Sequence, residues 1–83
     1  MIETIRETVS VEALFQEGRM LPRSFHWRRR SYPVKQITGC WSEREGQFRR
    51  YHYTVATDQP NIYELSFSTR DLGWQLVSVY YDG

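Results

Sequence analysis

Residues 47–68 read QFRRYHYTVATDQPNIYELSFS, and this stretch decides the fold. Residues 47–57 are rich in aromatic and β-branched side chains, which are typical of strands. In residues 62–68 apolar and polar side chains alternate, as they do in a strand with one buried face. Between these runs, residues 58–61 predict a turn, because Asp and Asn hydrogen-bond their own backbone and Pro presets its φ angle. The stretch therefore predicts two consecutive strands joined by a short turn.

Four further segments have strand character. Residues 8–16 alternate between apolar and polar side chains, which predicts a first strand. Residues 21–27 begin with a Leu-Pro pair that favours an extended backbone, and residues 31–41 predict a third strand with Pro33 at an edge or a bulge. Residues 74–81 are apolar on both faces, which is typical of a central or covered strand.

Three smaller features accompany these strands. Residues 42–46 are polar and predict a loop. Residues 2–8 predict either a frayed terminal segment or a short extension of the first strand. The apolar positions shift from even to odd numbers near Arg49 and Arg50, which indicates a bulge there.

The predicted fold class is all-β: an antiparallel meander of about six strands, curled into a small partial barrel. Strands joined by short turns pair with their neighbours in antiparallel fashion, and a curled sheet protects its edges. No segment has the apolar period of a helix. A chain of 83 residues has room for a single domain, so we expect residues 1–83 to form one small β domain.

The composition excludes several classes of protein. The single cysteine, Cys40, rules out an internal disulfide, and no CxxC or clustered His pattern offers metal ligands. No Gly-rich phosphate loop or GxSxG elbow is present. We therefore expect no metal, no cofactor and no enzymatic activity. The absence of a secretory signal and of an apolar run of about 20 residues predicts a cytoplasmic protein with no membrane contact.

Basic residues are concentrated in one part of a near-neutral chain. The formal net charge is +1, yet residues 19–41 contain six basic residues and no acidic one. Guanidinium groups contact phosphates and exposed rings stack on unpaired bases, so the basic and aromatic clusters in residues 26–32 and 49–53 are candidate binding surfaces. Alternatively, the rings belong to the core and the arginines to a solvated rim. The candidate binding residues are Trp27, Arg28, Arg29, Arg30, Arg49, Arg50, Tyr51 and Tyr53.

Several motifs resemble those of a family of uncharacterised small bacterial proteins. The family pattern is P-x-x-F-x-W-R-G-R-x-Y-x-V, and residues 22–34 read PRSFHWRRRSYPV. Further matches are Trp41 and the runs RYHYTV, YEL and WQL at residues 50–55, 63–65 and 74–76. A similar arrangement is found in the C-terminal part of ImuB-type proteins, inactive relatives of Y-family polymerases that act as scaffolds in bacterial damage-tolerant DNA synthesis. The resemblance covers residues 8–81.

The chain departs from this pattern at Arg29, where the family has Gly. If that Gly supplies a positive φ in a two-residue hairpin, Arg29 must accept about 1 kcal/mol of strain or occupy a different turn. The matched residues are mostly aromatic, so the resemblance identifies a fold better than an activity.

These observations favour a non-catalytic adaptor that docks on a protein partner through an aromatic-edged face or an exposed strand edge. The resemblance implies a setting in bacterial DNA repair or damage-tolerant replication. The alternative is binding of single-stranded nucleic acid, in which Trp27, Tyr51 or Tyr53 stacks on bases and the arginines neutralise phosphates. A third class is a small-molecule binder, which an apolar pocket open to solvent would favour. We expect a monomer or an edge-strand dimer.

Overall fold

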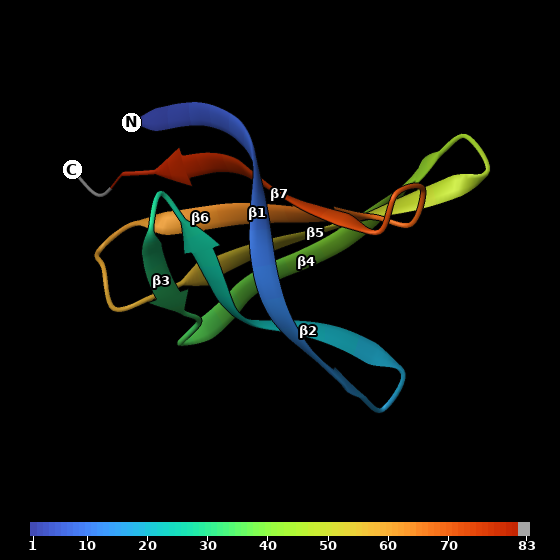
Figure 1. Cartoon of the computed structure of the whole chain (residues 1–83), viewed down its shortest axis with the longest axis horizontal. Helices are drawn as coiled ribbons and strands as arrows, with labels where there is room; N and C mark the ends of the chain where they lie inside the picture. Colours follow the sequence, from blue (N-terminus) through green and yellow to red (C-terminus); the bar gives the residue numbers. More distant parts are fainter. Residues whose placement is uncertain (82–83) are drawn as a thin grey trace.

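Seven strands form one antiparallel sheet in the computed structural model, which describes residues 1–81. These residues contain no helix, and so none that is long and apolar enough to cross a membrane. The sheet order is β3-β2-β1-β7-β6-β5-β4. β1 and β7, the first and last strands in the sequence, pair with each other and join two meanders (Figure 1). The all-β prediction is confirmed. The strands are β1 (Ile2–Gln16), β2 (Arg19–Trp27), β3 (Arg30–Pro33), β4 (Gln36–Glu45), β5 (Phe48–Ala56), β6 (Ile62–Ser68) and β7 (Gly73–Tyr80).

The third predicted strand is in fact two strands. β3 and β4 are separated by Val34 and Lys35. The Val34 amide donates to the Arg23 carbonyl on β2 (2.8 Å), whereas the Lys35 amide donates to the Ala56 carbonyl on β5 (2.8 Å). Consecutive amides therefore bond to β2, next to one edge of the sheet, and to β5, next to the other edge. Pro33, which has no N–H, is the last residue that pairs with β2.

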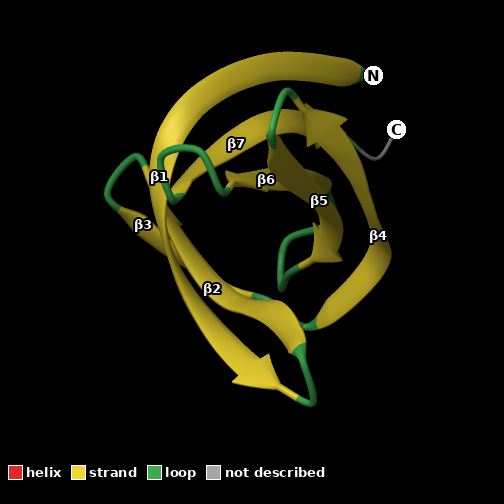
Figure 2. Ribbon diagram, turned by 90° about the vertical axis from the view of Figure 1, so that its right-hand side faces the viewer, coloured by secondary structure: helices red, strands yellow, loops and turns green. Residues whose placement is uncertain are grey.

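The short connection from β3 to β4 makes the sheet curl. β3 and β4 are its two edges, yet only Val34 and Lys35 separate them along the chain. Three Cα–Cα steps span at most about 11 Å, so the two edges must approach each other at this end. They do not pair, and the sheet is not closed into a barrel. Figure 2, which looks along the long axis, shows the strands wrapped around a common interior, as predicted for a partial barrel.

Two strands are longer than the sequence predicts. β1 begins at Ile2, so the N-terminal segment extends the first strand, and β4 continues to Glu45 through most of the predicted loop at residues 42–46. The bulge expected near Arg49 and Arg50 is absent, because the start of β5 pairs with β4 and β6 without a register shift. Register shifts occur instead elsewhere in the β1–β2, β1–β7, β4–β5 and β6–β7 pairs, where extra residues bend the sheet.

The core lies on the concave side of the sheet. Phe25 on β2 and Tyr32 on β3 stack with ring centroids 4.9 Å apart, and the Tyr63 ring on β6 lies 5.4 Å from each. Since β6 is not a neighbour of β2 or β3 in the sheet, these rings pack across the interior and hold the curl together. The buried apolar residues are Val9, Phe25, Tyr32, Tyr53, Val55, Tyr63, Leu65, Trp74, Leu76 and Val79.

The turn between β2 and β3 has the strained form anticipated for Arg29. Trp27 pairs with Arg30, which leaves Arg28 and Arg29 as a two-residue turn with φ angles of 51° and 65°. Both residues therefore occupy the left-handed region required by a type I′ turn, where a Cβ is unfavourable. The hairpin keeps the geometry that Asn-Gly or Gly-Gly pairs usually adopt, although two arginines form it.

Replacing Arg29 with Gly should stabilise the domain. Gly removes the strain of a Cβ at positive φ, and this gain exceeds the cost of the larger backbone entropy of Gly in the unfolded chain. We therefore expect the free energy of unfolding to rise by about 0.5–1 kcal/mol. Urea denaturation measures this change. Arg29→Ala is the control, because it removes the guanidinium but keeps the Cβ; an equal gain in that variant would contradict the explanation by strain.

Candidate functional site

The β2–β3 hairpin is attached to β1 by Glu7. The Trp27 Nε1–H donates to Glu7 Oε1 (2.8 Å), and Arg28 Nη2 donates to Glu7 Oε2 (2.8 Å). The bond from Arg28, followed by the bond from Trp27, holds the pKa of the Glu7 carboxyl below its usual value. The Arg28 Cζ atom also lies 4.6 Å from the centroid of the Trp27 ring. Two of the candidate binding residues are therefore engaged within the domain, whereas Arg29 and Arg30 are exposed.

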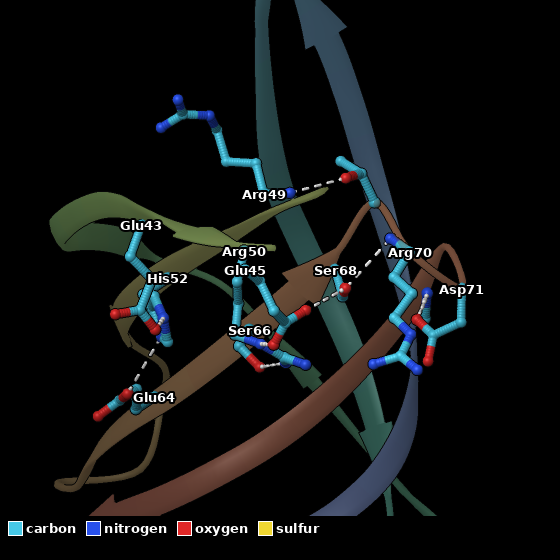
Figure 3. Close-up of polar contacts among 12 residues, drawn as sticks. Glu43, Glu45, Arg49, Arg50, His52, Glu64, Ser66, Ser68, Arg70 and Asp71 are labelled. Atoms are coloured by element: carbon cyan, nitrogen blue, oxygen red, sulfur yellow. Dashed lines mark hydrogen bonds and ion pairs between the residues drawn. The ribbon is translucent and has the colours of Figure 1, made fainter. Parts of the chain in front are cut away.

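Arg49 and Arg50 extend to opposite faces of β5 (Figure 3). On the convex face, Arg50 donates to Glu45 Oε2 (2.9 Å) and to Ser66 Oγ (2.9 Å). The pKa of the Glu45 carboxyl is lowered first by its bond to Arg50 and then by its bond to Ser68. Arg49 is exposed, and its guanidinium donates to Ser42 Oγ on β4 (3.2 Å).

Tyr51 and Tyr53 point into the concave side. Tyr53 is buried with 3% of its surface exposed, and its hydroxyl donates to the Met20 carbonyl (2.5 Å). Its ring is therefore part of the core and offers no face for a base to stack on. Tyr51 is half-buried and packs against the same core. The turn after Trp27 and the start of β5 lie at opposite ends of the long axis (Figure 1), so the two basic clusters do not form one surface.

A polar network that the sequence did not reveal covers part of the convex face (Figure 3). His52 Nε2 lies 3.0 Å from Glu43 Oε1, and His52 Nδ1 lies 3.5 Å from Glu64 Oε2. The Trp41 ring stacks on the imidazole at 5.1 Å, and the Tyr80 hydroxyl donates to Glu64 Oε1 (3.0 Å). Within residues 1–81, no three His, Cys, Asp or Glu side chains gather as metal ligands. These contacts involve side chains from β4, β5, β6 and β7, and His52 Nδ1 is buried without a hydrogen-bond partner.

A groove opens on the concave side between the β1–β2 hairpin and β4–β6. Its volume is about 370 Å³. Phe15 stands at one wall with 75% of its surface exposed, which is unusual for a large apolar side chain. Sequence alternation placed Phe15 on the apolar side of the first strand but could not show that the hairpin extends beyond the core. The groove is lined by Phe15, Gly18, Arg19, Met20, Cys40, Tyr51, Tyr53, Phe67 and Thr69.

The groove lies beside an unpaired sheet edge. β4 pairs with β5 on one side and is the last strand of the sheet on the other. Cys40, near the middle of β4, is an exposed free cysteine and lines the groove. The outward-facing backbone groups of β4 are thus available to an added strand along the mouth of the groove.

The Tyr53 hydroxyl predicts a loss of stability at high pH. Burial raises the pKa of Tyr53 to about 12. Because the folded pKa lies above the unfolded value of 10.0, the stabilisation from the neutral phenol is complete below pH 10 and is lost as the pH rises towards 12. Near neutral pH, Tyr53→Phe should lower the free energy of unfolding by about 1 kcal/mol relative to the wild type, because one hydrogen bond is missing. Between pH 10 and 12, however, the free energy of unfolding should fall less in Tyr53→Phe than in the wild type, because Phe does not ionise. Urea denaturation at a series of pH values tests both; parallel curves would contradict the assignment.

The comparisons with known proteins identify a family without an assigned activity. No curated protein and no solved structure matches the chain. A family model described as "Domain of unknown function (DUF6504)" matches residues 1–81, which is nearly the whole chain. The chain therefore belongs to the DUF6504 family.

Proposed function

We propose that this domain is a non-catalytic adaptor that binds an extended segment of a protein partner in the concave groove. The observation that carries the proposal is the exposed Phe15 ring, which faces aromatic walls beside the free edge of β4. Large aromatic side chains at a rigid, partly desolvated surface are the usual anchors of protein interfaces.

An added strand would use both features at once. A peptide that pairs with the edge of β4 forms main-chain hydrogen bonds, and its alternate side chains point to the concave face. One apolar side chain of such a peptide would enter the groove between Phe15 and Tyr51. A free small molecule could fill the same volume, but the Tyr53 and Thr69 hydroxyls already bond within the domain. Arg19 is the one charged residue among the described residues that line the groove, so few polar groups are placed to orient a small ligand.

Single-stranded nucleic acid is the weaker alternative. It called for the two basic clusters to lie together, but they lie at opposite ends, and Tyr53 is buried. Arg28, Arg29 and Arg30 are exposed at the β2–β3 turn and are the residues on which that alternative now rests. The resemblance to ImuB-type proteins supports a bacterial, cytoplasmic setting in DNA repair or damage-tolerant replication, with the partner a protein of that process.

Selection from a library of random displayed peptides tests the protein-binding proposal. We expect enriched peptides to share a large apolar side chain and to shift the NMR signals of Phe15, Tyr51 and the β4 edge. Phe15→Ser should weaken their affinity about 30-fold, since an aromatic anchor contributes about 2 kcal/mol. Ile2→Ser is the matched control, because Ile2 is also an exposed apolar residue of β1 (61%) but lies at its other end. Equal effects of the two substitutions would overturn the proposal.

Titration with a labelled mixed-sequence oligonucleotide tests the alternative. We expect no binding at about 50 mM salt, where phosphate contacts are strongest. Micromolar binding that collapses at about 200 mM salt and is lost on replacing Arg28, Arg29 and Arg30 with Ala would favour nucleic acid instead.

Sedimentation of the protein alone would detect a second copy of the domain paired with the β4 edge.

A further inference from the structure

Two arginines are paired across β4 and β5, beyond the groove residue Tyr51. Arg44 on β4 and Arg49 on β5 are partners in the strand register. Paired residues share a face of the sheet, and Arg49 is two residues from Tyr51, so both guanidinium groups belong to the concave side with the groove. Like charges directly opposite each other destabilise a strand pair. This arrangement costs folding free energy that a neutral residue would avoid.

The backbone places Arg49 against the wall of the groove. The Arg49 amide donates to Thr69 Oγ1 (3.0 Å), and the Thr69 amide donates to the Arg49 carbonyl (3.0 Å). Thr69 itself lines the groove. Figure 3 shows the Arg49 side chain leaving β5 on the side opposite to Arg50 and its partner Glu45.

A third arginine lies across the groove. Arg19, at the start of β2, is exposed and lines the opposite wall. Arg28 and Arg50 have carboxylate partners, but none of the ion pairs among residues 1–81 includes Arg19, Arg44 or Arg49. Among residues 1–81, no acidic side chain lines the groove. Arg19 therefore lies in the wall of an apolar slot, and Arg44 and Arg49 lie beyond Tyr51 on the same face of the sheet, next to the lining residue Thr69.

We propose that Arg19, Arg44 and Arg49 select a partner segment with acidic residues flanking its apolar anchor. This inference rests on the proposed function, because it requires a peptide in the groove. Charge complementarity supports it: carboxylates of the peptide would relieve the repulsion between Arg44 and Arg49 and would accept charge-assisted hydrogen bonds. The apolar side chain then supplies most of the affinity, and the arginines supply the choice among partners.

Synthetic peptides ten residues long, the length of β4, test the inference. Each contains one central Trp or Leu flanked by Glu, Ser or Lys. We expect the Glu peptide to bind about tenfold more tightly than the Ser peptide and the Lys peptide to bind most weakly. This is the effect of a few solvent-exposed ion pairs. The preference should shrink as salt is raised.

Charge reversal identifies the residues responsible. Arg44→Glu with Arg49→Glu should reverse the order, so that the Lys peptide binds more tightly than the Glu peptide. Arg44→Ala with Arg49→Ala should reduce the preference without reversing it, and tests the inference even if the reversed variant does not fold. The matched control is Arg29→Glu with Arg30→Glu, which changes net charge equally at the far end of the molecule and should leave the order unchanged.

The outcomes separate the two proposals. If no peptide binds, or if Phe15→Ser has no effect on binding, then the groove is not a peptide site and the proposed function fails. If the peptides bind and depend on Phe15, but flank charge and the Arg44 and Arg49 substitutions make no difference, only the selection of acidic partners is overturned.

Discussion

The two-residue connection between β3 and β4 is the constraint on which the rest of the structure depends. The Val34 amide bonds to β2 and the Lys35 amide bonds to β5, so this connection fixes the two edges of the sheet close together at one end. Every other strand must curve to satisfy that closure, which brings Tyr63 onto the stacked Phe25 and Tyr32 rings. A longer connection would leave the two meanders free to splay. Instead, the domain obtains a packed interior from a single sheet without helices to cover it.

The two faces of the curled sheet carry different kinds of side chains. The centre of the concave face is apolar and aromatic, whereas on the convex face His52 Nε2 lies 3.0 Å from Glu43 Oε1 and Arg50 bonds to Glu45. Buried hydroxyls such as that of Ser66 are satisfied there by arginine. The groove persists because the edges approach at one end but diverge at the other, where the β1–β2 hairpin extends.

Local patterns were sufficient to predict most strands, because alternation and turn residues are written in neighbouring positions. The break within the third predicted strand was missed because it depends on which distant carbonyl each amide reaches. The hydrogen-bond partner of the Trp27 indole is also distant in sequence, since Glu7 is 20 residues away. Likewise, alternation cannot distinguish a buried Tyr53 from an exposed Phe15, since both lie on the apolar side of a strand. The groove depends on the extension of the β1–β2 hairpin past the core, which local alternation does not encode.

The pairing of β1 with β7 brings the two ends of the described chain together: the Tyr81 amide donates to the Met1 carbonyl (2.8 Å). Both ends lie on the left in Figure 1, whereas the tips of the β1–β2 and β4–β5 hairpins point away from them. Closely spaced termini allow a domain to be inserted into a loop of another protein or to be circularly permuted with little loss of structure. A host chain, a surface tether or a fluorescent reporter attached here would leave the opposite end of the molecule facing outward.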